Sequence, residues 1–113
     1  MNNHEISLQQ AIDMTTRYRA NKPANAPICE TFDITAIIQL AEVTDCTYMR
    51  IYYGMKENMD IDAILVAVNE NNQDILPSQT GNEIAIESGD PVILEDGYRC
   101  PPDCPPKSPL NGN

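Results

Sequence analysis

The feature that most constrains the fold is the stretch 47–69, which holds the densest run of β-branched and aromatic residues in the chain. Within it, residues 61–68 are apolar at odd and at even positions, apart from Asp62. A half-exposed strand alternates apolar and polar residues, whereas a strand covered on both faces is apolar throughout. A short buried helix gives a similar run, but the β-branched content favours a strand. We therefore expect a hairpin whose second strand forms the centre of a sheet.

The first strand of this hairpin has two faces of different character. One face is apolar and carries Met49, Ile51 and Tyr53. The other carries side chains that combine an apolar body with a polar tip, namely Tyr48, Arg50 and Tyr52. Such side chains suit a surface that is partly wet or that meets a partner. Tyr48, Arg50 and Tyr52 are therefore the predicted binding residues.

Two helices are predicted before the hairpin. Ser7 followed by Gln10 has the spacing of a capping box, and Pro23 ends the helix that begins there. The apolar face predicted for this helix consists of Leu8, Ala11, Ile12, Thr15 and Tyr18. A second helix over about residues 33–42 would bury Ile34, Ile37, Ile38 and Ala41.

Two more strands are predicted after the hairpin, at 83–87 and 91–94. This order of elements indicates an α+β fold, with two N-terminal helices packed on one face of a small, mostly antiparallel sheet. Residues 1–98 form the single predicted domain, and 99–113 form a tail rich in proline and cysteine. We expect the tail to cover the sheet up to residue 105 and to be disordered beyond it.

The charge distribution is uneven. The formal net charge is -10, and residues 57–96 contain ten acidic residues and no Lys or Arg. Phosphate binding needs a basic patch, so this composition argues against a nucleic-acid partner. An acidic surface keeps a protein soluble, and it can also dock on a basic protein partner.

The expected compartment is the cytoplasm. The sequence has no apolar run of the roughly 18 residues that a transmembrane helix needs, so we expect no membrane contact. The first five residues are polar and acidic, whereas a secretory signal begins with basic and then apolar residues.

The cysteines allow three interpretations. Cys100 and Cys104 have a spacing seen in zinc half-sites, and Cys29, Cys46 or His4 could complete such a site. However, neither Cys29 nor Cys46 has a second ligand close in sequence, so no metal is predicted. A disulfide between Cys100 and Cys104 would close a short loop, but a reducing cytosol opposes it. We expect free thiols.

No catalytic residue and no cofactor are predicted. The single histidine, His4, lies near the end of the chain, so a serine or cysteine nucleophile lacks a base. The sequence has no glycine-rich phosphate loop. The acidic residues between 60 and 74 lack the central glycine and the closing glutamate of a calcium-binding loop.

Four segments, at 6–11, 49–54, 65–71 and 99–106, together resemble a group of small uncharacterised bacterial proteins with a Cys-Pro-Pro-x-Cys-Pro tail. The resemblance implies a bacterial, single-domain protein and brings no activity or site residue with it.

The leading functional hypothesis is a non-enzymatic binding module that forms a homodimer through the face of Tyr48, Arg50 and Tyr52. Two helices can cover only one face of the sheet, so Val66, Val68 and the tyrosines need cover on the other. The first alternative is an acidic inhibitor or immunity-type protein that blocks a basic site on a partner. The second is a thiol or zinc protein that uses the C-terminal cysteines.

Overall fold

A computed structural model describes residues 3–78 and 87–112 of the chain. Its elements are α1 (Leu8–Asn21), β1 (Cys29–Thr31), α2 (Ile34–Ala41), β2 (Tyr48–Met55), β3 (Ile61–Val68), β4 (Asp74–Ile75), β5 (Ile93–Leu94) and β6 (Tyr98–Cys100). The strand predicted at 83–87 lies outside these residues except for Glu87. In the part of the chain that is described, no helix is long and apolar enough to cross a bilayer.

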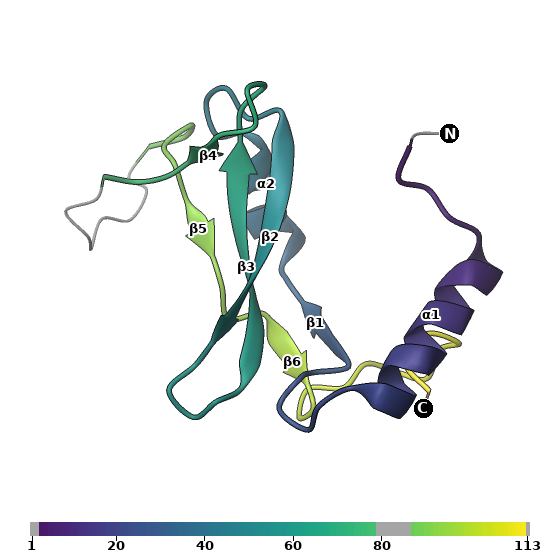
Figure 1. Ribbon diagram of the computed structural model, residues 1–113. Coiled ribbons are helices and arrows are strands. Elements are labelled where there is room, and N and C mark those ends of the chain that lie inside the picture. The colour runs from purple at the N-terminus through teal and green to yellow at the C-terminus, as the bar shows by residue number, and fades with distance from the viewer. Residues whose placement is uncertain (1–2, 79–86, 113) are drawn as a thin grey trace.

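The larger sheet is built on the hairpin of β2 and β3, as predicted (Figure 1). β2 pairs with one side of β3, from Tyr48 opposite Val68 to Met55 opposite Ile61. The two short strands β4 and β5 pair with its other side, and all these pairings are antiparallel. The α+β class and the central position of β3 are therefore confirmed.

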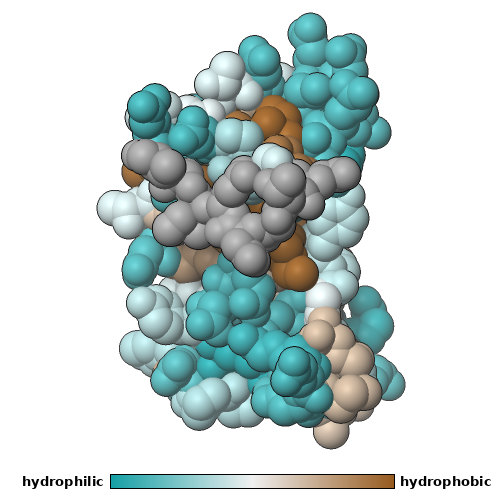
Figure 2. Space-filling view, turned by 90° about the vertical axis from the view of Figure 1, so that its left-hand side faces the viewer, coloured by the Kyte–Doolittle hydropathy of each residue, from teal (hydrophilic) through white to brown (hydrophobic). Residues whose placement is uncertain are grey.

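The core lies between this sheet and α2. Leu40 of α2 and Val43, which follows the helix, pack with Leu65 and Ala67 of β3 and with Val92. The buried face predicted for α2 is therefore wrong in part, because Ile34 is 68 % exposed, Ile38 is 49 % exposed and Leu40 is buried instead. Side chains alternate between the two faces of a strand, so Val66 and Val68 lie on the face of β3 away from α2. Seen from the side of β4 and β5, the most apolar side chains are visible as patches in the upper and middle parts of the molecule (Figure 2).

A second sheet joins β1 and β6, and it takes in part of the predicted tail. Cys29 pairs with Cys100, Glu30 with Arg99 and Thr31 with Tyr98. The Cys100 side chain is completely buried. Arg99 and Cys100 are therefore part of the folded structure and not of a tail, because β1 supplies hydrogen-bond partners for their backbone.

The first helix begins and ends as predicted but does not pack on the sheet. The Ser7–Gln10 capping box is present, and the helix ends at Asn21. However, none of its residues is buried, and α1 stands apart from both sheets, beside the C-terminal segment (Figure 1). Arg19 Nη1 donates to the carbonyl of Leu110 at 2.5 Å. Small side chains such as Ala11 and Thr15 offer little apolar area, which limits what docking on a sheet would contribute.

Candidate functional site

The candidate site is the outer strand of the larger sheet, β2. One side of β2 pairs with β3, and no strand among the described residues pairs with the other side. Tyr53 is 81 % exposed. In all, six large apolar or aromatic side chains on the two faces of β2 are exposed: Tyr48, Met49, Ile51, Tyr52, Tyr53 and Met55. An eight-residue strand of this composition at a sheet edge is a template for pairing with another strand.

The hydrogen bonds of β3 show which backbone groups of β2 point outward. The N–H groups of Ile61 and Ala63 donate at 2.9 Å to acceptors on the side of β3 away from β2. In an antiparallel pair, two opposite residues that do not bond each other both direct their backbone groups away from each other. Met55 and Tyr53 stand opposite these residues. The outward N–H and C=O groups, at a period of two, are therefore those of Met49, Ile51, Tyr53 and Met55.

The three predicted binding residues lie together on the face of β2 away from α2. The Tyr52 hydroxyl donates to Asp74 Oδ2 at 2.5 Å, and Arg50 Nη1 lies 2.5 Å from Asp74 Oδ1. The hydrogen bond from Tyr52, followed by that from Arg50, lowers the pKa of the Asp74 carboxyl. Tyr48 is 55 % exposed and stays at the surface.

The Arg50 and Tyr52 side chains cross β3 to reach Asp74 in β4. Arg50 stands opposite Val66, and both Val66 and Val68 are at most 2 % exposed. The two valines are therefore covered within the same chain, and they leave no apolar surface on this face for a second copy to cover. What stays exposed is the outer strand itself.

An open groove of about 640 Å³ runs along part of β2. Its lining includes His4 from the N-terminal segment and Tyr48, Met49, Arg50 and Ile51 from β2.

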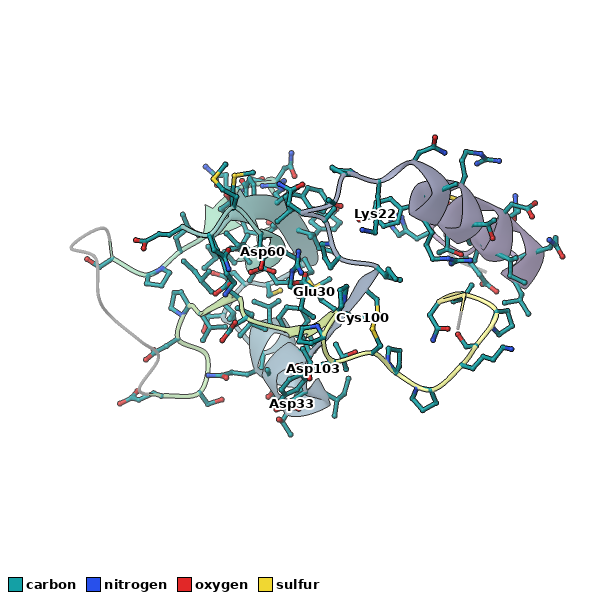
Figure 3. All side chains as sticks on the ribbon, turned by 90° about the horizontal axis from the view of Figure 1, so that it is seen from below. Lys22, Glu30, Asp33, Asp60, Cys100 and Asp103 are labelled. Carbon is teal, nitrogen blue, oxygen red and sulfur yellow. A yellow bond between two sulfur atoms is a disulfide. The ribbon has the colours of Figure 1, made fainter. Side chains whose placement is uncertain are left out.

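An ionic cluster around Asp62 connects the two sheets at the opposite side of β3, and it was not predicted from the sequence. Asp62 is only 3 % exposed. Lys56 Nζ lies 3.3 Å from its Oδ2, and Arg99 Nε lies 3.4 Å from its Oδ1. Asp60 Oδ1 lies 3.7 Å from Arg99 Nη2, and the view from below in Figure 3 shows Asp60 and Glu30 near each other. The one sequence signal was an acidic residue, Asp62, within an otherwise apolar strand.

The pKa values of Glu30 and Asp62, two acids of this cluster, shift in opposite directions. Burial raises the pKa of Glu30. Burial alone would also raise the pKa of the Asp62 carboxyl. Hydrogen bonds with Glu30 and Glu95 and the charge of Lys56 outweigh that effect and hold it below its usual range. Since its polar groups tie the two sheets together, this cluster has a structural role.

The prediction that all the cysteines are free thiols is wrong. Cys100 and Cys104 form a disulfide with their Cα atoms 4.5 Å apart (Figure 3). The Asp103 N–H donates to the carbonyl of Arg99 at 2.8 Å, and this turn brings the two cysteines together. Cys29 and Cys46 are free thiols. Among the described residues, no three His, Cys, Asp or Glu side chains are grouped to hold a metal ion.

Comparison of the chain with protein-family models, with curated proteins and with solved structures finds no match. The resemblance to a group of bacterial proteins stays an untested prediction.

Proposed function

We propose that the protein is a non-enzymatic interaction module that forms a homodimer by antiparallel pairing of β2 with β2 of a second copy. The observation that carries this proposal is the unpaired outer side of β2, with exposed apolar side chains on both faces. Proteins usually protect such an edge with lysine, proline, a bulge or a covering segment. Between Tyr48 and Met55 there is no lysine and no proline.

The distribution of charge supports a second copy as the occupant. With a net charge of -10, two copies repel each other over most of their surfaces. Residues 46–56 contain no Asp or Glu and include Arg50 and Lys56. This strand is therefore where two copies can approach without placing carboxylates face to face.

The outward backbone groups define a register for the dimer. Antiparallel pairing about a two-fold axis is self-complementary, because each copy offers the same groups to the other. An axis through Tyr52 pairs Ile51 with Tyr53 of the second copy and Met49 with Met55. All four outward-pointing residues of each strand then bond to the partner.

This register also avoids a repulsive contact. Arg50 stands opposite Gly54 of the second copy, so the two guanidinium groups do not face each other. Tyr52 stands opposite its own counterpart, and cross-strand aromatic pairs are favourable. Shifting the axis to Arg50 would oppose two like charges, which is unfavourable.

Replacing Tyr53 tests whether the dimer forms through β2. Tyr53→Lys places a charge next to the two-fold axis in each copy, and we expect the dissociation constant to rise at least about 10-fold. Met14→Lys also introduces a lysine, at an exposed position of α1, and should leave the dimer intact. Sedimentation velocity over a concentration series measures both. A wild-type protein that is monomeric at about 100 μM would refute the proposal.

Replacing Tyr52 tests the register separately. In the proposed pairing, the two copies of residue 52 form a non-hydrogen-bonded pair with Cα atoms about 4.5 Å apart, within reach of a disulfide. Tyr52→Cys should therefore crosslink to itself under mild oxidation, whereas Tyr48→Cys, on the same face, should not. A dimer that crosslinks only through Tyr48→Cys would keep the homodimer and overturn the register.

The acidic-inhibitor hypothesis has weaker support. Among the described residues between 57 and 96, five acidic side chains form ion pairs within the chain: Asp60, Asp62, Asp74, Glu95 and Asp96. Their partners are Arg50, Lys56 and Arg99, which all lie outside that segment. These three basic side chains therefore already compensate part of the negative charge that could face a basic partner.

The compartment proposed for the module remains the cytoplasm. A disulfide in the cytosol is usually transient and takes part in catalysis or redox sensing. The bond between Cys100 and Cys104 would then be one that opens and closes.

A further inference from the structure

The second sheet brings a third cysteine next to the disulfide. Cys29 of β1 stands directly opposite Cys100 of β6. Residues directly opposite in an antiparallel pair share one face of the sheet, with Cβ atoms about 4.5–5.5 Å apart. Their Cα separation, about 4.5–5.5 Å, lies within the range that disulfides use. Cys100 therefore has two neighbours it can bond: Cys104 along the chain and Cys29 across the sheet.

The three cysteines of this arrangement differ in exposure. Cys100 is completely buried, Cys29 is half-buried and Cys104 is exposed. The other free cysteine, Cys46, packs against the core of the larger sheet. Cys46 serves as an internal reference, because it is also a free thiol but does not lie opposite a cysteine of the disulfide in the sheet.

We propose that Cys29, Cys100 and Cys104 form a thiol–disulfide exchange site. The Cys29 thiol first loses its proton to solvent. The resulting thiolate attacks Cys100 Sγ, so that a Cys29–Cys100 bond forms while the Cys100–Cys104 bond breaks. Cys104 leaves as a thiolate. The number of disulfides is unchanged, and the step needs no oxidant or reductant.

The exchange moves the reactive thiol from a half-buried to an exposed position. The Cys104 thiolate can then attack an external disulfide of low molecular weight, such as oxidised glutathione. One glutathione leaves as a thiolate, and the other stays bound to Cys104 as a mixed disulfide. The ligand class of the site is therefore small thiols and disulfides.

Oxidised glutathione is the probe that tests the site. The folded, disulfide-containing protein is incubated with it, quenched with acid, and mapped as non-reduced peptides by mass spectrometry. We expect a Cys29–Cys100 crosslink together with one glutathione on Cys104. Cys46→Ser should behave like the wild type, whereas Cys29→Ser should keep the Cys100–Cys104 bond and take up no glutathione on Cys104. A glutathione on Cys29 with the original disulfide intact would overturn the proposal.

A second variant keeps the test valid if Cys29→Ser folds poorly. Cys104→Ser removes the partner along the chain, so that oxidation should join Cys29 to Cys100 within one molecule. If both cysteines of this variant remain open to alkylation after oxidation, they are not close enough to exchange and the proposal fails. The site lies on the second sheet and is independent of the homodimer through β2.

Discussion

At the scale of single residues, the Glu30–Asp62 pair shows how a protein buries two acids side by side. Glu30 Oε1 and Asp62 Oδ2 are both buried, and the only cation beside this pair of oxygens is Lys56, whose Nζ lies 3.3 Å from Asp62 Oδ2 among the described residues. A proton on Glu30 allows the two carboxyls to bond each other, in agreement with the raised pKa of Glu30 and the lowered pKa of Asp62. The other oxygen of Glu30 accepts from the Ala63 N–H at 2.9 Å.

This arrangement predicts the effect of Glu30→Gln. Because the pKa of Glu30 is raised from 4.5 in the folded chain, the contribution of Glu30 to the stability of the wild type is lost as the pH rises above 4.5 through the raised value. The amide introduced by the substitution does not ionise, and its N–H group can donate to Asp62. We expect the variant at pH 7 to be at least as stable as the wild type, by up to about 1 kcal/mol.

Urea unfolding at pH 4 and pH 7 measures this effect. The free energy of unfolding of Glu30→Gln relative to that of the wild type should be larger at pH 7 than at pH 4. Glu42→Gln removes an exposed acid and should leave the difference unchanged. A Glu30→Gln protein that is less stable than the wild type by more than about 1 kcal/mol at pH 7 would show that Glu30 is needed as an anion.

At the scale of elements, α1 and β3 represent two ways of forming secondary structure. α1 has a complete capping box, but none of its residues is buried, so local hydrogen bonds define it. β3 is defined by packing, because Leu65, Val66, Ala67 and Val68 are all buried. Stability is therefore expected to differ between the two elements.

Removing the N-terminal cap of α1 tests whether the stability of α1 is independent of that of β3. Ser7→Ala deletes the acceptor for the Gln10 N–H, and losing such a cap costs about 1 kcal/mol. We expect amide hydrogen exchange in α1 to become about 5-fold faster, while the amides of β3 keep their protection. Slower or equal exchange in α1, or faster exchange in β3, would contradict an independent helix.

At the scale of the whole molecule, stability depends on the contact between α2 and the larger sheet. Leu40 is 1 % exposed and packs with Leu65, Ala67 and Val92. Leu40→Ala should lower the free energy of unfolding by about 2–5 kcal/mol, as measured in urea. Ile34→Ala, on the same helix but at a position 68 % exposed, should change it by less than about 1 kcal/mol. Equal effects of the two substitutions would place the core elsewhere.

Several elements could be predicted because their signal is local. Ser7 and Gln10 are three residues apart, and the alternation along 61–68 repeats every two residues. The outer strand, with Tyr48, Arg50 and Tyr52 on one face, was predicted in the same way. However, its bonds to Asp74 in β4 were not, since they join residues more than 20 positions apart.

The sequence by itself determined the helices, the hairpin and the chain's acidic charge, because periodicity, capping and composition act between close neighbours. Only the tertiary structure decided that α1 stands apart from the sheet and that Asp62 is buried against Glu30 and Lys56. It also brought Cys29 opposite Cys100. These arrangements depend on which distant strands pair, and pairing is set by the burial of the whole core and not by local pattern.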